Sequence, residues 1–185
     1  FMNSYKNGKT PNPCILCNRI FKFGLFYQKA KELNADYIAT GHYAKIIDNK
    51  LVMSEATGKD QSYFLNQIEK EVLPYIIFPL NKYQSKEEIR ALARKYNLPV
   101  SEKKDSREIC FIPNDDYKTF LQKNGQTDKP DNIVLKNGKI LGKHTGLYIY
   151  TIGQRKDLNI SYKEPLYVLQ LDTKNNNLIV GTNED

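Results

Sequence analysis

A helical pattern that runs directly into a short apolar strand constrains the fold of this chain more than any other stretch. Between Cys17 and Asn34, apolar residues recur at helical spacing: Ile20, Phe23, Phe26, Ala30 and Leu33. The run ADYIATGHY, residues 35–43, follows and has the composition of a buried strand that ends at a glycine. A helix that leads into a buried strand is typical of α/β domains, in which ligands bind at the carboxyl ends of parallel strands.

The remainder of the chain predicts short helices and hairpins. Residues 44–55 favour two strands about a turn at 48–50, and residues 59–68 favour a short helix. Ser85 precedes Glu88 by three residues, a capping box that opens an amphipathic helix. After a domain boundary that we place near Pro113, the sequence predicts one helix (DDYKTFLQK) and two hairpins (NIVLKNGKILG and YVLQLDTKNNNLIVG).

Composition narrows the class of protein. No apolar run approaches the roughly 18 residues that span a bilayer, so we expect no membrane anchoring, and the first residues do not resemble a secretory signal. Three cysteines are too few for a disulfide framework, which favours a reducing cytoplasm. The formal charge of +7 suits a polyanionic partner, although a merely solvated basic surface explains it equally well.

The stretch PNPCILCNR places two thiols three residues apart at the expected start of the first helix. A helix amino terminus stabilises a thiolate, and we expect Cys17 to be the reactive member of the pair. The spacing alone also fits a redox pair, a zinc half-site or two buried residues, although three cysteines exclude a structural Cys₄ site. Cys110 has apolar neighbours, which favours a small buried residue.

Two polar groups also have alternative interpretations. His42 follows the strand-end glycine, where it either faces a ligand or caps the loop. Lys59, Asp60 and Gln61 lie at a helix start and suit either contact with phosphate and ribose or simple capping.

Six blocks taken together resemble the tRNA-specific 2-thiouridylases, enzymes that place sulfur on C2 of the wobble uridine. The blocks are GKTPNPCILCNRIFKF, ADYIATGHYAK, KDQSYFL, FPL, KKDSREICFI and GKHTGLYIYTIGQRKDL, in family order over essentially the whole chain. The resemblance implies an α/β fold: residues 1–112 as the later half of an adenine-nucleotide α-hydrolase-like (ATP-pyrophosphatase) parallel-sheet domain, and 113–185 as a small, strand-rich α+β central domain that contacts tRNA. The family's SGGVDSS-type ATP loop and its carboxyl-terminal barrel are not in this sequence, so we expect an internal fragment that is inactive alone.

The resemblance also implies roles for individual residues. In such enzymes ATP, with Mg²⁺, adenylates the uridine, and sulfur arrives as a persulfide. Cys110 matches the persulfide-carrying position, and Cys17 matches the second catalytic cysteine, which either releases sulfide from the persulfide or closes a disulfide after transfer. Gly41 matches a position beside the nucleotide. The positions that match contacts to the flipped base or to tRNA are Asn12, Pro13, Cys14, His42, Lys59, Asp60 and Gln61.

Further contacts and partners are less closely defined. Lys143, His144, Arg155 and Lys156 are candidate contacts to the tRNA backbone, with an ordinary basic surface as the alternative. The resemblance implies a sulfur-relay protein or cysteine desulfurase as sulfur donor and a cytoplasmic location.

Two rival functions remain open at this stage. Many relatives carry Asp where this chain has Cys14, so Cys14, Cys17 and Cys110 are alternative ligands for an iron–sulfur cluster; we otherwise expect no metal site. A module that binds RNA without catalysis is the other rival.

Overall fold

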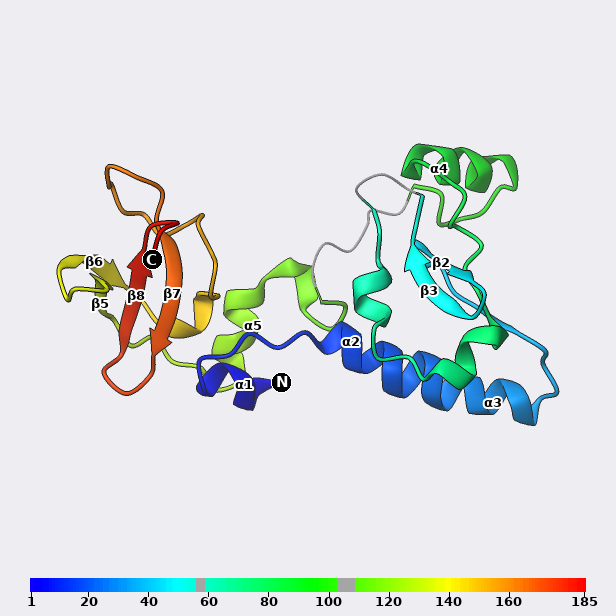
Figure 1. Cartoon of the computed structure of the whole chain (residues 1–185), viewed down its shortest axis with the longest axis horizontal. Coiled ribbons are helices and arrows are strands. Elements are labelled where there is room, and N and C mark those ends of the chain that lie inside the picture. Colours follow the sequence, from blue (N-terminus) through cyan, green and yellow to red (C-terminus); the bar gives the residue numbers. More distant parts are fainter. Residues whose placement is uncertain (56–58, 103–108) are drawn as a thin grey trace. The chain divides into compact units, whose positions relative to one another are not determined.

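The structure is a computed structural model that describes residues 1–55, 59–102 and 109–185 (Figure 1). The chain divides into two compact units, which we call the thiol-helix unit (Asn12–Ser106) and the hairpin unit (Phe1–Pro11 with Arg107–Asp185). The expected boundary near Pro113 stays a prediction. The charged run before Cys110 lies largely outside the described residues. Within these residues, no helix has both the length and the apolar character needed to cross a membrane.

The thiol-helix unit begins with one continuous helix made of three segments: α2 (Pro13–Cys17), η1 (Asn18–Leu25) and α3 (Phe26–Glu32). Asn12 caps the start of the helix: its side chain accepts a hydrogen bond from the Cys14 backbone. Proline is tolerated at the first helical position because a backbone N–H there would have no partner within the helix. The predicted helix is therefore confirmed, but its start is corrected from Cys17 to Pro13. Cys14, not Cys17, occupies the first turn.

The middle segment η1 is a π-helix, and a glycine makes its geometry possible. A Cβ on Gly24 would lie 2.9 Å from the backbone oxygen of Arg19, closer than a side chain tolerates. Residues five apart are separated by about 140° on an α-helix but by much less on a π-helix. As a result Asn18 and Phe23 are both buried, each 3% exposed.

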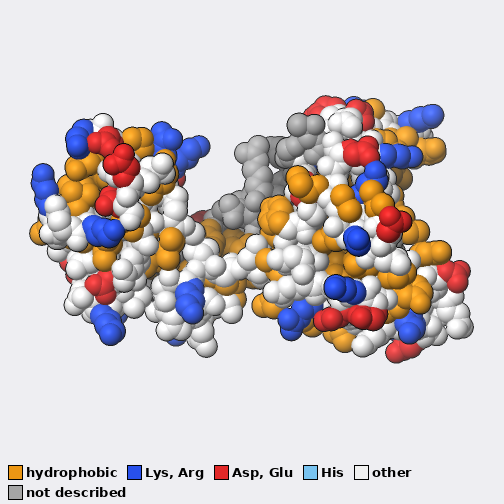
Figure 2. Space-filling view, in the orientation of Figure 1, with side chains coloured by type: hydrophobic (Ala, Val, Ile, Leu, Met, Phe, Trp, Pro, Cys, Tyr) orange, Lys and Arg blue, Asp and Glu red, His pale blue; other side chains and the backbone are white. Residues whose placement is uncertain are grey.

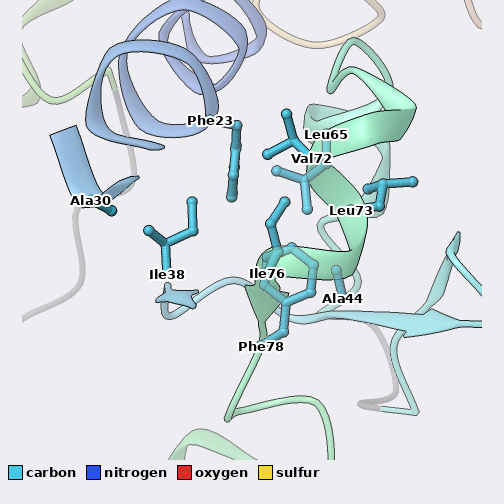
Figure 3. Close-up of a cluster of buried hydrophobic side chains, with 9 residues drawn as sticks. All are labelled: Phe23, Ala30, Ile38, Ala44, Leu65, Val72, Leu73, Ile76 and Phe78. Carbon is cyan, nitrogen blue, oxygen red and sulfur yellow. The ribbon is translucent and has the colours of Figure 1, made fainter. Parts of the chain in front are cut away.

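The strands of this unit are short. β1 (Ile38–Ala39) pairs in parallel with β4 (Ile76–Ile77), and β2 (Ala44–Ile47) forms an antiparallel hairpin with β3 (Lys50–Met53). The 3₁₀ segments η2 (Ser62–Leu65) and η3 (Lys70–Tyr75) follow. The hairpin and a short helix near residue 62 are confirmed, whereas the expected strand within 35–43 shrinks to two residues. Apolar side chains from these segments enclose one core: Phe23, Ala30, Ile38, Ala44, Leu65, Val72, Leu73, Ile76 and Phe78 (Figure 3).

The helix α4 (Lys86–Lys95) is the last helix in the described part of this unit, and the predicted capping box is nearly as expected. The Ser85 hydroxyl accepts from the Glu88 backbone at 3.2 Å. The Glu88 carboxylate accepts from the Gln84 backbone rather than from Ser85. No residue of α4 is fully buried, so local capping contributes much of its stability.

The hairpin unit contains the helices α1 (Met2–Lys6) and α5 (Tyr117–Lys123), the 3₁₀ turns η4 (Pro113–Asp115) and η5 (Leu147–Ile149), and a four-stranded sheet. The strands are β5 (Asp131–Leu135), β6 (Ile140–His144), β7 (Tyr167–Asp172) and β8 (Asn177–Gly181), in the order β6-β5-β8-β7. Both predicted hairpins are confirmed, and β5 and β8 join them in parallel.

Two apolar clusters hold the hairpin unit together. The first lies about the sheet and includes the fully buried Leu178 and Val180. The second joins the start of the chain to residues far along it, with Tyr5, Leu121 and Tyr148 at its centre and Phe1 packed edge-on against Phe111. The first eleven residues thus belong with the hairpin unit, an arrangement that no local sequence pattern indicates.

Candidate functional site

Hydrogen bonds within the thiol-helix unit join the three sequence blocks that were expected to form a site. From the helix, the Asn18 side-chain nitrogen donates to the Phe64 backbone oxygen at 3.0 Å. Three residues before Phe64, the Gln61 backbone donates to the Tyr43 oxygen at 2.8 Å. Next to Tyr43, His42 bonds Lys22 and so returns to the helix. The blocks around residues 12–22, 40–43 and 59–64 therefore form one closed circuit of contacts.

The two thiols of the helix occupy different environments from those expected. The Cys14 backbone donates to the Asn12 side-chain oxygen at 3.2 Å, which places Cys14 among the unpaired amides of the first helical turn. Cys17 lies at the junction with the π-helical segment, just before the buried Asn18. Both residues are half-buried, and neither is disulfide-bonded within the described residues. The helix-terminus argument for Cys17 is therefore wrong, and it applies to Cys14 instead.

His42 has a partner at each ring nitrogen. Nδ1 lies 2.8 Å from the Thr40 hydroxyl, and Nε2 lies 3.3 Å from the Lys22 ammonium. An ammonium can only donate, so Nε2 accepts and Nδ1 carries the proton that is donated to Thr40. Burial, assisted by the positive charge of Lys22, lowers the pKa of His42 to about 4. The ring is neutral near pH 7, and Lys22 is the cation of this pair.

Asp60 and Gln61 are occupied by internal contacts. The carboxylate of Asp60 accepts from the Ser54 backbone at 2.7 Å and from the Ser62 hydroxyl at 2.6 Å. The Gln61 side-chain oxygen accepts from the Tyr43 backbone at 3.1 Å. Of the three residues proposed from this block, Lys59 is the exposed one. Asp60 and Gln61 thus fasten the block to the neighbouring strands, in agreement with the capping alternative.

Gly41 lies at the wall of a pocket of about 450 Å³ that also contacts α4. Two cationic side chains, Lys86 and Arg90, line it together with Gln61 and apolar residues. A Cβ added to Gly41 would meet the Leu80 side chain at 3.7 Å, an ordinary contact, so space alone does not require glycine there. Cations beside an apolar wall suit a ligand that carries both phosphate and a ring system.

Cys110 lies in the hairpin unit and is exposed and free, so the expectation from its apolar neighbours that it is buried is wrong. Lys143, Arg155 and Lys156 are also exposed, as contacts to a nucleic acid require. His144 is not: it is 2% exposed, and its Nε2 donates to the Asn176 backbone oxygen at 2.8 Å. Its assignment as a tRNA backbone contact is therefore corrected, because its ring is buried beside Tyr150 and cannot reach a nucleic acid.

The described residues contain no group of three His, Cys, Asp or Glu side chains placed to hold a metal ion. The two thiols of the helix and Cys110 belong to different units, so neither unit alone gathers all three. Sequence reasoning also missed Lys22 and Asn18. A lysine on the polar side of a helix gives no local signal that it belongs to a site. The apolar spacing of the helix leaves Asn18 among the polar residues, and only the fold shows that its side chain is buried.

Comparisons with known proteins place this geometry in a family. The family described as "tRNA methyl transferase HUP domain" matches residues 1–114, and "tRNA methyl transferase PRC-barrel domain" matches residues 118–182. A Fusobacterium nucleatum protein named tRNA-specific 2-thiouridylase MnmA 1 is 52% identical over 187 residues, which cover 100% of this chain and 51% of the relative. A Trichlorobacter lovleyi protein named tRNA-specific 2-thiouridylase MnmA is 49% identical over 186 residues, covering 98% and 52%. The chain spans about half the length of the curated relatives it matches.

Proposed function

This chain belongs to the tRNA-specific 2-thiouridylase family, with a HUP domain followed by a PRC-barrel domain, and from this premise we propose that it serves sulfur transfer to C2 of the wobble uridine of tRNA. The circuit that joins residues 12–22, 40–43 and 59–64 is the observation that most supports the proposal. The circuit brings the thiol helix, through Asn18 and Lys22, into contact with the strand-end loop and with the segment that follows the Lys59–Gln61 block, although these segments are far apart in sequence.

The target base is proposed to lie against the start of the helix. Asn12, Pro13 and Cys14 form a rigid corner there, because proline fixes the backbone and the Asn12 side chain is held to the Cys14 amide. A base flipped from its stack costs a few kcal/mol, and a preformed corner limits any further ordering cost. Lys22, held by His42, supplies positive charge to the same unit, and we assign it, rather than His42, to a tRNA phosphate.

Bound ATP, with Mg²⁺, would supply the AMP group that turns the uridine C2 oxygen into a leaving group. Gly41, Lys86 and Arg90 are the residues of this chain proposed to meet the nucleotide, because their pocket combines positive charge with an apolar wall. No stretch of the sequence resembles the family's ATP loop, so we expect the chain alone to be inactive.

The sulfur chemistry is assigned to Cys17 and Cys110. A donor protein, a sulfur-relay protein or cysteine desulfurase, loads Cys110 with a persulfide; exposure of this thiol supports that access. The terminal sulfur forms a bond to C2 as the bond from C2 to the adenylated oxygen breaks. The Cys17 thiolate then attacks the Cys110 sulfur and closes a disulfide, which breaks the bond between Cys110 and the transferred sulfur and leaves that sulfur on C2. On the alternative route Cys17 attacks the persulfide first, the disulfide closes as sulfide leaves, and the sulfide displaces AMP from C2. On either route the transferred sulfur is reduced while the two cysteine thiols are oxidised to a disulfide, which a later thiol reductant restores. Because the thiols lie in different units, transfer requires the units to meet.

The test uses a protein that combines this chain with the ATP loop and carries Cys17→Ser, Cys110→Ser or the control Cys14→Ser. We expect the first two variants to lose thiolation, measured by mass spectrometry of tRNA nucleosides, while ATP-dependent tRNA binding remains. Cys14→Ser changes a proposed contact to the base but not a sulfur carrier, so it should weaken tRNA binding at most and retain thiolation at saturating tRNA. Full activity of either Cys17→Ser or Cys110→Ser would show that the assigned roles are wrong.

Anaerobic iron–sulfur reconstitution separates this proposal from a cluster-dependent reaction. The persulfide route predicts no bound iron and no visible charge-transfer absorbance when all three thiols are intact. Stoichiometric iron that is lost in Cys14→Ser would favour the cluster instead.

A further inference from the structure

The two thiols of the helix are separated by one regular α-helical turn. Both lie in α2 (Pro13–Cys17), before the π-helical segment begins at Asn18. The Asn18 backbone donates to the Cys14 oxygen, the hydrogen bond between residues four apart that defines an α-helix. Residues three apart on an α-helix share a face, with Cα atoms about 5 Å apart. That separation suits a disulfide, whereas the wider turn of a π-helix would rotate the two side chains apart.

The backbone on either side of this turn is held in place. Before it, the Asn12 side chain accepts from the Cys14 backbone at 3.2 Å, and Pro13 restricts the backbone. After it, the buried Asn18 side chain donates to the Phe64 oxygen at 3.0 Å. The two thiol residues are half-buried rather than fully enclosed, so another sulfur atom can reach them. The helix therefore keeps the two thiols close together in every arrangement of the two units.

The proposed reaction leaves a disulfide that has to be opened before the next cycle. It joins Cys17 to Cys110, and neither sulfur can act again until that bond breaks. Cys14 lies one turn before Cys17 on the same helix. A thiol held within the same molecule attacks at a higher effective concentration than a dissolved thiol does. The first helical turn also favours the thiolate, which is the form that attacks.

We propose that Cys14 is the resolving thiol of this reaction, an inference that rests on the proposed function. The Cys14 thiol gives its proton to solvent, and its thiolate attacks the Cys17 sulfur. A bond between Cys14 and Cys17 forms as the bond between Cys17 and Cys110 breaks, and Cys110 leaves as a thiolate. The exchange involves no net oxidation, because one disulfide replaces another. Cys110 is then ready for a new persulfide, and the later thiol reductant acts on the disulfide within the helix.

The first experiment tests closure of the helix disulfide without tRNA. The Cys110→Ser variant of the 185-residue chain is treated with one equivalent of dithiobis(nitrobenzoate), an aromatic disulfide. Attachment to either remaining thiol releases one thionitrobenzoate ion, and closure of the disulfide between Cys14 and Cys17 releases a second. We expect two ions per chain and a product that, by mass spectrometry, has lost two hydrogens and carries no adduct. A stable adduct with one released ion would overturn the inference.

The matched control keeps two thiols but changes their placement. It combines Cys110→Ser with Cys14→Ser and Leu16→Cys, so that the thiols occupy adjacent positions, which do not face each other on a helix. Leu16 is 50% exposed, so its replacement removes little packing, and circular dichroism checks that both proteins are equally helical. The second release should be at least about tenfold slower in the control. Equal rates would contradict the geometry on which the inference depends.

The second experiment maps disulfides in a protein that combines this chain with the ATP loop, after one round of thiolation without reductant. We expect a disulfide between Cys14 and Cys17 and a reduced Cys110, found by mass spectrometry of unreduced peptides. Cys14→Ser should instead retain the disulfide between Cys17 and Cys110. Persistence of that disulfide in the wild-type protein overturns only the role of Cys14. Thiolation with no disulfide at Cys17 contradicts the proposed sulfur chemistry as well.

The third experiment separates the resolving role from a contact to the base. Repeated turnover is measured at saturating tRNA, which removes any difference in affinity, with limiting and then with excess dithiothreitol. Cys14→Ser should turn over several-fold more slowly than the wild-type protein at limiting dithiothreitol. Excess dithiothreitol should restore its rate, because the small thiol then opens the disulfide between Cys17 and Cys110 directly. Equal rates at limiting dithiothreitol, or a defect that excess dithiothreitol does not restore, would overturn the inference.

Discussion

The two units of this chain differ in how many of their large apolar side chains are exposed to solvent. In the hairpin unit, a four-stranded sheet and two clusters bury most large apolar side chains, and among the described residues only Phe111, Ile140 and Ile152 remain strongly exposed. All other exposed large apolar side chains lie in the thiol-helix unit, along its helix and around its short strands, and apolar atoms are plain on its surface in Figure 2.

The difference shows what each unit needs from its surroundings. A two-residue parallel pair, β1 with β4, leaves strand edges that can accept further strands, and apolar helix surface such as Leu33 at 70% exposed is suited to burial against another element. The hairpin unit has the features of a self-sufficient domain, whereas the thiol-helix unit carries the paired thiols on a scaffold with open strand edges.

The largest expected effect tests whether the units are independent. Leu178→Ala in the hairpin unit and Leu65→Ala in the thiol-helix unit each remove a fully buried side chain, 0% and 1% exposed. Each should destabilise its own unit by about 2–5 kcal/mol. Differential scanning calorimetry should then show that each variant lowers one of two transitions. A single transition whose temperature both variants lower equally would mean that the two units unfold together and are not independent.

The π-helical segment is expected to be the next most sensitive feature. Gly24→Ala would place a methyl group 2.9 Å from the Arg19 backbone oxygen, and a backbone atom cannot move aside as a side chain can. We expect a loss of roughly 1–3 kcal/mol in the thiol-helix unit alone, measured by urea unfolding. Gly125→Ala provides a contrasting control in the hairpin unit: its Cβ meets no atom within 4 Å, although its φ of +93° adds backbone strain.

Removal of a helix cap from each unit should have a smaller effect on stability. Ser85 accepts from the Glu88 backbone in α4, and Asp116 accepts from the Thr119 backbone in α5. Replacement of either by alanine should cost about 1 kcal/mol. Hydrogen exchange should show local fraying of α4 after Ser85→Ala, because α4 has no buried residue, whereas Leu121 anchors α5. Equal exchange in both helices would contradict this reading.

His42 gives the thiol-helix unit a pH dependence. Its pKa is lowered to about 4 in the folded chain, chiefly by burial, so between pH 4 and 6.5 the unfolded chain binds the extra proton. Stability is therefore full above pH 6.5 and falls as the pH drops toward 4. We expect a loss of about 1 kcal/mol, reduced by solvent screening because the ring is partly exposed. An NMR titration should show that Lys22→Met raises the pKa of His42 but leaves it below the usual value of 6.5, because burial is the larger cause of the shift.

Substitution of an exposed apolar side chain should have the smallest effect on the free energy of unfolding, within about 0.5 kcal/mol. Leu33→Lys should leave the unfolding free energy almost unchanged and reduce self-association measured by light scattering, because it interrupts that surface. Ile140→Lys, at a position 60% exposed in the hairpin unit, is the matched control and should have little effect on association.

Local patterns predicted the hairpins, the capping box and the amphipathic helix well, because turn residues, caps and apolar spacing act over a few residues. The true start of that helix was missed, since Pro13 and the Asn12 cap outweigh the apolar spacing that begins later. The burial of His144 was also missed. A basic block surrounds it in sequence, yet its partner, Asn176, is 32 residues away.

The sequence by itself determined the family, much of the order of the elements and the residue types that the proposed sulfur transfer requires. Only the tertiary structure decided which of these residues meet. The contacts of Asn18 with Phe64, of Lys22 with His42 and of Phe1 with Phe111 join distant segments, and such contacts form only when the apolar side chains of each unit are buried together. Short-range preferences carry no information about them.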